Sequence, residues 1–276
     1  MSIIGKPFGL TTATGDAAYV PEGAIWLDGS ADYLSWTPGS AGNRKTWTLS
    51  AWVKRSDITS KNTIIGAGTS LSDSGEFIVK FNDTADGDQL TAQTGSTVPT
   101  VTSAVYRDPT AWQHVMYSCD TTQASDQFTL IVNGVVVTAL STDNDLTQDT
   151  DTGMTNNVVH EIGRYPRVTG QYFNGYLSEV ILLDGTASTD ASEFGEFNSD
   201  GVWIPKDPTT VVTDNKGTNG FWLDFADSSD LGNDVSYSGL GVGTDNSFTA
   251  NSMSSANSTN DRPADSGSTI GNYCTW

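Results

Sequence analysis

Residues 128–140, FTLIVNGVVVTAL, constrain the fold more than any other stretch of this chain. Asn133-Gly134 separates two apolar, β-branched runs and favours a type I′ hairpin turn, in which both central residues need φ > 0. A two-residue loop also fixes the register. The predicted pairs are Val132 with Val135, Leu130 with Val137, and Phe128 with Ala139. Because so apolar a hairpin is not stable alone in water, we expect it to be a central part of a larger sheet stack.

Further strands are predicted where apolar and β-branched residues alternate with polar ones between turn signals. They cover residues 24–28, 33–36, 46–54, 63–67, 76–81, 89–93, 112–119, 158–165, 172–183 and 220–225. The 28 glycines and the low share of charged residues, 17%, suit many short strands joined by polar turns. The pattern therefore predicts an all-β sandwich or barrel.

The segment 46–54, TWTLSAWVK, alternates most clearly. Its apolar side is formed by Trp47, Leu49, Ala51 and Val53. We interpret it as a half-buried strand with one extra aromatic residue, Trp52, on its outer side.

The chain divides into three parts by composition. Residues 1–22 form an extended N-terminal arm, which is either a free terminus or a docking segment; residues 23–226 form the sandwich; and residues 227–276 form a loop-rich extension. Residues 189–197 are predicted to form one short helix capped by Thr189 or Asp190, and regular structure is expected to stop at 203–208.

The formal net charge of −20 disfavours nucleic acid as a partner. The sequence starts without a signal-peptide pattern, and no apolar run is long enough to insert across a membrane. Cys119 is expected to be a buried small apolar residue. The sequence does not decide whether it forms a disulfide with Cys274.

The acidic loops raise the question of calcium. They contain Asp143, Asp145, Asp149 and Asp151 in one cluster, and Asp224, Asp227, Asp230 and Asp234 in another. Oxygen ligands suit Ca²⁺, but neither spacing matches a helix-loop-helix calcium motif. We expect no cofactor, with Ca²⁺ as the open alternative to solvated surfaces.

Catalysis is not expected. Glycosidases place two carboxylates on either side of the scissile bond, whereas Glu76 and Glu179 each stand alone in their strands and Glu193 and Glu196 lie in the predicted helix. The two histidines, His114 and His160, lie in strand patterns and are interpreted as structural.

The best candidate for a binding site is the loop at residues 164–172, RYPRVTGQY. It combines two arginines with two tyrosines at a strand end, and aromatic rings flanked by polar groups suit the binding of sugars. The glycan-binding candidates are Arg164, Tyr165, Arg167 and Tyr172. The alternative is a packing or subunit-contact loop, since the same residue types are enriched at protein interfaces.

The ordered segments TWTLSAWVKRS, IIGAG, AWQHVMYSCD, FTLIVNGVVV and FNGYLSEVILLDG, within residues 24–185, resemble the laminin-G-like, concanavalin A-like family. That resemblance implies a jelly-roll sandwich of two antiparallel sheets. The later segments EFGEFNSDGVWIPKDP and GFWLDFADSSDLGNDVSYSG are similar to the version found in virion proteins of tailed bacteriophages.

The resemblance implies a non-enzymatic virion subunit, such as a tail fibre, an appendage or a capsid-decorating protein, assembled in the host cytoplasm and located in the virion. Its expected partners are other virion proteins, reached through the N-terminal arm, and host-surface polysaccharide. A homo-oligomer is expected, with a trimer as one form. The alternative is a purely structural assembly or decoration protein that binds no glycan.

Overall fold

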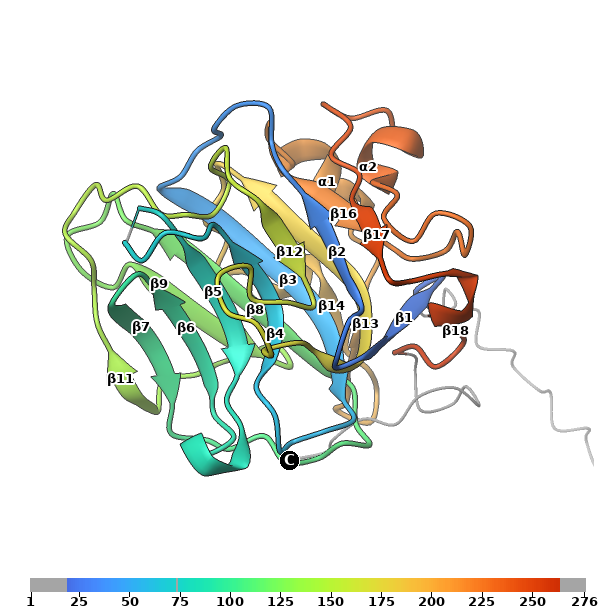
Figure 1. The fold of residues 1–276 in the computed structure, drawn as a ribbon, viewed down its shortest axis with the longest axis horizontal. Coiled ribbons are helices and arrows are strands. Elements are labelled where there is room, and N and C mark those ends of the chain that lie inside the picture. Colours follow the sequence, from blue (N-terminus) through green and yellow to red (C-terminus); the bar gives the residue numbers. More distant parts are fainter. Residues whose placement is uncertain (1–18, 73, 264–276) are drawn as a thin grey trace, which may run out of the picture.

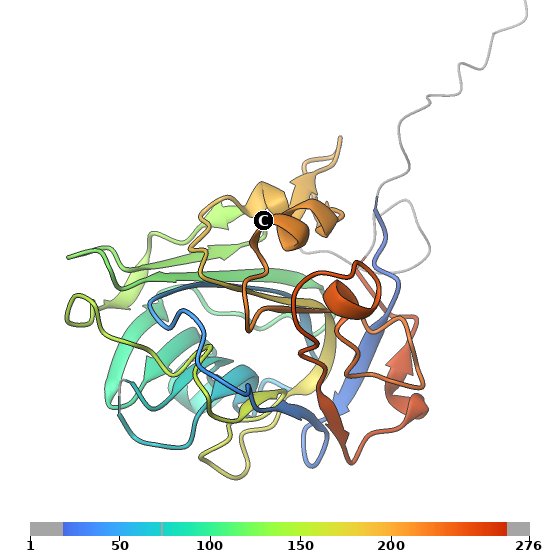
Figure 2. The ribbon, with the colours of Figure 1, turned by 90° about the horizontal axis from the view of Figure 1, so that it is seen from above.

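The computed structural model describes residues 19–72 and 74–263 and confirms the predicted all-β sandwich. Two eight-stranded antiparallel sheets pack face to face, and Figure 2 shows them as separate layers. Sheet A has the order β10-β9-β8-β3-β13-β1-β18, with β16 also paired to β13. Sheet B has the order β11-β7-β6-β5-β4-β12-β2-β17 (Figure 1).

The strands of sheet A are β1 (Ala24–Asp28), β3 (Thr46–Arg55), β8 (Gln113–Asp120), β9 (Phe128–Val132), β10 (Val135–Val136), β13 (Asn174–Asp184), β16 (Phe221–Leu223) and β18 (Ser258–Thr259). The strands of sheet B are β2 (Tyr33–Trp36), β4 (Asn62–Ala67), β5 (Phe77–Phe81), β6 (Leu90–Thr94), β7 (Thr97–Thr102), β11 (Leu140–Asp143), β12 (His160–Ile162) and β17 (Thr249–Asn251). Outside them lie the strands β14 (Gly195–Phe197) and β15 (Trp203–Pro205), the helices α1 (Thr209–Asn215) and α2 (Val235–Ser238), and the 3-10 turns η1 (Thr84–Asp86), η2 (Ala191–Glu193) and η3 (Ser255–Asn257).

The predicted hairpin turn is confirmed, but its place in the sheet is not. Asn133 and Gly134 have φ of 49° and 76°, and Val132 pairs with Val135 as expected. The expectation of a central position is wrong, because β9 and β10 form the edge of sheet A and Val135 is 60% exposed. The strand β10 has only two residues, the N–H of Val137 beyond it still donates to the carbonyl of Leu130 at 2.9 Å, and the chain then crosses to sheet B as β11.

The core between the sheets contains the apolar side predicted for β3. Trp47 is fully buried there, and its ring meets Phe77 of sheet B at 4.8 Å between centroids. Cys119 is also buried in this core as a free thiol. Its suggested partner Cys274, like most of the predicted N-terminal arm, lies outside the described residues.

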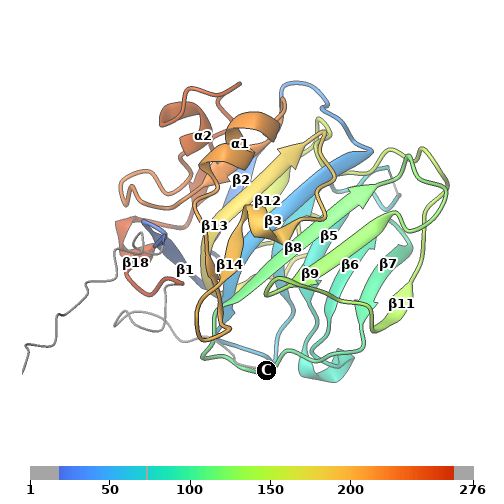
Figure 3. The ribbon, with the colours of Figure 1, turned by 180° about the vertical axis from the view of Figure 1, so that it is seen from behind.

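The outer face of sheet A is buried as well, and this corrects the expectation for Trp52. Trp52 is 1% exposed because residues 191–215, which we call the covering segment, pack over it. The covering segment contributes Ala191, Phe194, Trp203, Val211 and Val212 to an apolar cluster with Met116 and Ile181 of the sheet. Figure 3 shows α1 and β14 lying over this face.

The covering segment differs from the sequence prediction in its local structure. Instead of one helix at 189–197, η2 is followed by β14, which pairs with β15. The expectation that regular structure stops at 203–208 is wrong, because β15 occupies Trp203–Pro205 and α1 begins at Thr209. Tertiary packing of Phe194 and Trp203 against sheet A overrides the weak local helical preference.

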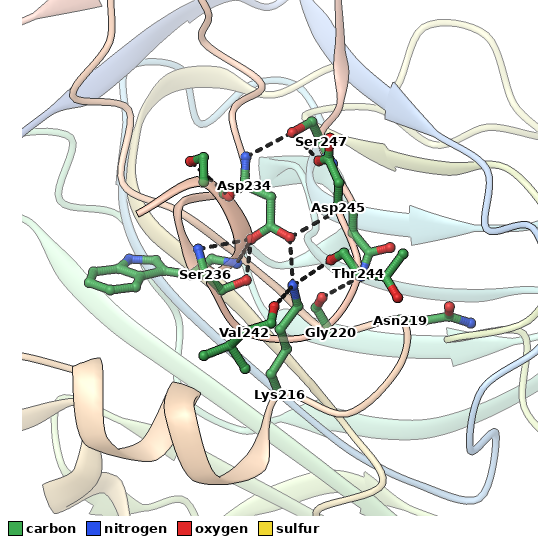
Figure 4. A network of polar contacts seen from close by, with 12 residues as sticks. Lys216, Asn219, Gly220, Asp234, Ser236, Val242, Thr244, Asp245 and Ser247 are labelled. Carbon is green, nitrogen blue, oxygen red and sulfur yellow. Dashed lines mark hydrogen bonds and ion pairs between the residues drawn. The ribbon is translucent and has the colours of Figure 1, made fainter. Parts of the chain in front are cut away.

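The C-terminal part is joined to both sheets through β17 and β18, which pair with β2 and β1. A buried ion pair fixes residues 234–246, the segment that precedes β17 (Figure 4). The ammonium of Lys216 lies 2.9 Å from Asp234 Oδ2 and donates to the carbonyl oxygens of Val242 and Thr244 at 3.0 and 2.6 Å. Asp234 accepts in addition from the backbone N–H groups of Trp222 and Asn246, so both charges are fully hydrogen-bonded.

No helix among the described residues is both long enough and apolar enough to cross a membrane.

We expect Lys216→Met to destabilise the protein by about 3–5 kcal/mol, because it leaves the carboxylate of Asp234 buried without its cation. The measurement is the free energy of unfolding from urea titration. Lys45→Met is the matched control, since Lys45 pairs with the largely exposed Asp149 and its loss costs about 1 kcal/mol or less. Equal destabilisation by both substitutions would contradict this role for the buried pair.

Candidate functional site

The outer face of sheet B carries the side chains that point away from the core. Because side chains alternate along a strand, Val79 of β5 enters the core while Lys80 lies on the outer face. In β12, Ile162 enters the core and Glu161 lies on the outer face. Residues 163–172, between β12 and β13, fold back over this face, and we call them the outer loop (Figure 1).

The outer loop is closed like a small hairpin. Arg164 and Tyr172 form an isolated antiparallel bridge, and the N–H of Tyr165 donates to the carbonyl of Gln171 at 3.3 Å. These contacts bring both ends of the loop to the same place on sheet B. The side chains of Arg164 and Tyr172 therefore lie together, although eight positions separate them in the sequence.

A glycine in β4 allows the outer loop to lie directly on the sheet. A Cβ atom at Gly66 would lie 2.6 Å from Cδ of Pro166, closer than side chains can approach. Glycine inside a strand often marks such a close approach of another chain segment. Gly66 thus fixes the height of the outer loop above the sheet.

A buried carboxylate anchors the outer loop. Glu76 is 0% exposed; its Oε1 accepts from the Tyr165 hydroxyl at 3.0 Å, and its Oε2 accepts from Nε of Arg167 at 2.6 Å. Arg167 also donates from Nη2 to Glu76 Oε1 at 3.1 Å and to the Tyr165 hydroxyl. Burial, followed by the charge of Glu76, raises the pKa of Tyr165 to about 12. Tyr165 and Arg167 therefore tie the outer loop to the start of β5.

A second group of polar side chains on this face consists of Arg164 and Tyr172 of the outer loop and Tyr33 of β2. The guanidinium carbon of Arg164 lies 4.7 Å from the ring centre of Tyr33 and 5.5 Å from that of Tyr172. The two rings meet edge to face at 6.3 Å, and all three side chains are partly exposed. Cation–π contacts of this kind hold the guanidinium of Arg164 against both rings. We call these three residues the aromatic stack.

Glu161 lies under the aromatic stack with part of its hydrogen-bonding capacity unused. Its Oε1 accepts from Nη1 of Arg164 at 3.1 Å, while Glu161 Oε2 and Arg164 Nε are buried and have no partner among the described residues. Burial raises the pKa of Glu161, and Arg164 opposes this shift. A buried polar atom without a partner is costly, and a ligand recovers that cost where the side chains of Glu161 or Arg164 move to admit it.

The structure places the four predicted binding residues in two groups. Arg164 and Tyr172 belong to the partly exposed aromatic stack, whereas Tyr165 is 2% exposed and anchors the loop with Arg167. Sequence reasoning missed Tyr33 and Glu161. A signal for Tyr33 was present, because its neighbour Leu34 alternates into the core. Glycan binding by this loop stays a prediction.

The remaining carboxylates considered from the sequence lie in separate surroundings. Glu179, at a bulge in β13 with φ of 50°, accepts from the Tyr19 hydroxyl at 3.0 Å and from Nε1 of Trp222 at 2.6 Å. Burial raises the pKa of Glu179 to about 8. Glu193 of η2 and Glu196 of β14 lie in the covering segment over sheet A.

Both histidines are buried structural residues, as expected. Burial lowers the pKa of His114 to about 3, and that of His160 to about 4. His114 lies 2.9 Å from the Ser50 hydroxyl and accepts from the Trp203 indole at 3.3 Å, all within the protein interior.

The two acidic clusters do not gather into a cation site. Asp145 accepts from two backbone N–H groups, and Asp149 and Asp151 pair with Lys45 and Arg44. Asp234 forms an ion pair with Lys216. In residues 19–72 and 74–263 there is no group of three or more acidic, histidine or cysteine side chains placed to hold a metal ion. Calcium binding stays an untested alternative.

Together these features define a two-sheet β-sandwich with a loop and an aromatic stack on the outer face of one sheet. The sequence model of the concanavalin A-like lectin/glucanases superfamily matches residues 28–191, more than half of the chain. The chain belongs to this superfamily. No curated protein sequence is similar enough to the chain to count as a relative.

Solved structures share the fold at low sequence identity. A putative carbohydrate binding protein from Bacteroides ovatus has a TM-score of 0.51 at 18% identity, over 83% of this chain and 58% of that chain. A heptameric SAP-like pentraxin from Limulus polyphemus has a TM-score of 0.49 at 16% identity, over 63% and 80%. Domain 4 of the arabinanase AbnA from Geobacillus stearothermophilus, in complex with arabinotriose, has a TM-score of 0.44 at 16% identity, over 63% and 78%.

We expect Arg167→Met to loosen the outer loop, because it leaves the buried carboxylate of Glu76 without its cation. Hydrogen exchange of the backbone amides in residues 163–172 should become at least about tenfold faster. Arg107→Met removes a guanidinium from another buried carboxylate, that of Asp88, and serves as the control. The anchor role is refuted if residues 163–172 exchange at the same rate in Arg167→Met as in the unchanged protein.

Proposed function

We propose that the protein binds glycans, without cleaving them, through the aromatic stack of the outer loop. The observation that carries the proposal is the partly exposed Tyr33–Arg164–Tyr172 stack beside a carboxylate oxygen that has no partner. Binding sites for small molecules combine apolar or aromatic surface with a few placed polar groups. A sugar ring offers the matching pair: an apolar C–H face for the tyrosine rings, and hydroxyl groups for Arg164 and Glu161.

The setting of these residues supports the proposal. Tyr33 lies on β2 and Glu161 on β12, two paired strands, and Glu76 ties the outer loop to the sheet. Binding groups held on strands keep their geometry better than groups on free loops. The lectins in the superfamily description, and the carbohydrate named for the Bacteroides ovatus protein, agree with a glycan ligand.

The non-enzymatic part of the proposal is supported by the pairing of the two carboxylates on this face. Glu76 and Glu161 are each ion-paired with a different arginine of the outer loop. Glycoside cleavage needs two carboxyl groups free to act on opposite sides of one bond. Release of reducing sugar ends from a bound polysaccharide would contradict this part.

We expect Tyr172→Ala and Tyr33→Ala each to weaken glycan binding about tenfold or more, because an aromatic contact surface is lost. The measurement is binding to an array of bacterial surface glycans, followed by calorimetry with those that bind. Tyr237→Ala is the control, since Tyr237 is a 46% exposed tyrosine on α2, which contacts β16 of sheet A and is not part of the aromatic stack. Tyr165→Ala reports on loop anchoring instead, because Tyr165 is buried. Unchanged binding in both stack variants would refute the site.

We further propose that the protein acts as a subunit of a tailed-phage virion, in a fibre, an appendage or a decorated capsid. The support is the resemblance of residues 193–208 and 220–239 to phage virion proteins. In the fold these residues supply Phe194 and Trp203 to the cover over sheet A, and Trp222 of β16 joins the same apolar cluster from the sheet. The alternative is a purely structural decoration protein that binds no glycan; a homo-oligomer, with a trimer as one form, is expected in either case.

For the virion role, we expect the protein to be present in purified particles of the phage that encodes it, and to block adsorption when added to host cells before the phage. Mass spectrometry of the particles and counts of free phage are the two measurements. Presence without blocking favours the decoration role, because the glycan surface is then not used for attachment. Absence from the particles refutes the virion role, and a monomer in light scattering at high concentration refutes the homo-oligomer.

A further inference from the structure

The outer face of sheet B and its margin carry a group of four cations and three carboxylates, although the whole chain has a formal net charge of −20. Three of its cations are paired: Lys61 with Asp86, Arg164 with Glu161, and Arg167 with Glu76. The fourth cation, Lys80, has no carboxylate within ion-pair distance in the described part of the chain. Its ammonium has one acceptor, the amide oxygen of Gln171 at 3.3 Å, and is 5.6 Å from the Tyr165 ring centre.

Three polar atoms on this face have no partner among the described residues: the Thr63 hydroxyl, Nε of Arg164 and Oε2 of Glu161. Thr63, opposite Lys80 across β4 and β5, is 0% exposed and its hydroxyl has no partner. Nε of Arg164 also lacks an acceptor. The ammonium of Lys80 has only one long contact, and the free acceptor on this face is Glu161 Oε2. A ligand that bonds to Lys80 and to Arg164 must therefore supply an acceptor to each of these two cations, and the Thr63 hydroxyl can donate to the same acceptor.

We propose that the glycan is acidic, and that a sugar carboxylate binds Lys80 and the Thr63 hydroxyl in place of the Gln171 amide oxygen. This inference rests on the proposed glycan function of the aromatic stack. Gln171 directly precedes Tyr172, so the carboxylate position adjoins the surface that receives the sugar ring. A sugar hydroxyl donates to Glu161, and the ligand's other oxygens accept from Arg164.

Gln171 is suited to be displaced. Its side chain is partly exposed, and the preceding Gly170, with φ of 86°, is exposed and has open space around it. The Gln171–Lys80 contact at 3.3 Å is long, and only its donor carries a charge. A carboxylate in the same position adds the attraction between two opposite charges and favours a shorter bond.

The charge state of Lys80 gives a pH signature. Burial lowers the pKa of Lys80 to about 8. The charged and titratable groups that face it are Lys61, Asp86, Arg167, Glu76 and Tyr165. A bound carboxylate raises the pKa of Lys80 again, so affinity is full below pH 8 and falls as pH rises through 8 and beyond.

The experiment compares polygalacturonate, alginate, hyaluronan and polysialic acid, each beside its carboxyl-reduced neutral form, by calorimetry at constant salt. At least one acidic form is expected to bind about tenfold or more tightly than its reduced form, as the loss of one charge-assisted bond predicts. Lys80→Met should remove this preference, and Lys80→Arg should keep it up to pH 9.5. Gln171→Glu should weaken acidic binding, because it places a carboxylate on Lys80 within the protein.

Lys45→Met is the control for Lys80→Met, because it changes the net charge by the same amount. Lys45 pairs with Asp149, so this variant should keep the preference for the acidic form. The acidic-ligand inference fails if the acidic and reduced forms bind equally. It also fails if only neutral glycans bind and Tyr172→Ala abolishes that binding. In both cases the proposed glycan-binding function stands. If no glycan binds, both fail. Binding of acetate or phosphate as tight as that of the acidic polysaccharide also overturns the inference, because the sugar then contributes nothing.

Discussion

The fold depends on the apolar character of both faces of sheet A. An antiparallel sheet commonly leaves one face to water, but here Trp52, Met116 and Ile181 point away from the inter-sheet core and have to be covered. The covering segment does this with Phe194, Trp203 and α1, and the buried Lys216–Asp234 pair fixes the chain that follows. Residues 191–215 are thus required for the burial of the outer face of sheet A, and the Lys216–Asp234 pair ties the C-terminal extension to them.

This arrangement leaves the outer face of sheet B as the surface on which polar groups gather. That face is not apolar enough to need a covering layer, and one short loop lies on it instead. The loop is held by Glu76 and by the approach of Pro166 to Gly66, so its polar groups are fixed by strands rather than by the loop alone. The aromatic stack is also held in place by the sheet, because Tyr33 and Glu161 belong to paired strands.

Local sequence patterns predicted much of this fold, and contacts between residues far apart in the sequence determined the rest. The turn at Asn133-Gly134 follows from φ preferences, but the crossing of the chain to sheet B after β10 does not. The alternation in β3 was right, while the exposure expected for Trp52 was wrong because its cover comes from residues 191–215. In the outer loop, residue types indicated a binding surface, but Tyr165 is buried by a partner 89 positions earlier, which no local pattern reveals.

Global and local charge also answer different questions about ligands. The formal net charge of −20 describes the field that a large polyanion meets at a distance, and it supports the exclusion of nucleic acid. At physiological ionic strength that field decays over about 8 Å, so a ligand in contact with the outer loop responds mainly to the groups beside it. There Lys80 is a cation without a paired carboxylate among the described residues. A strongly acidic chain can therefore still present a site at which a negative group is favoured.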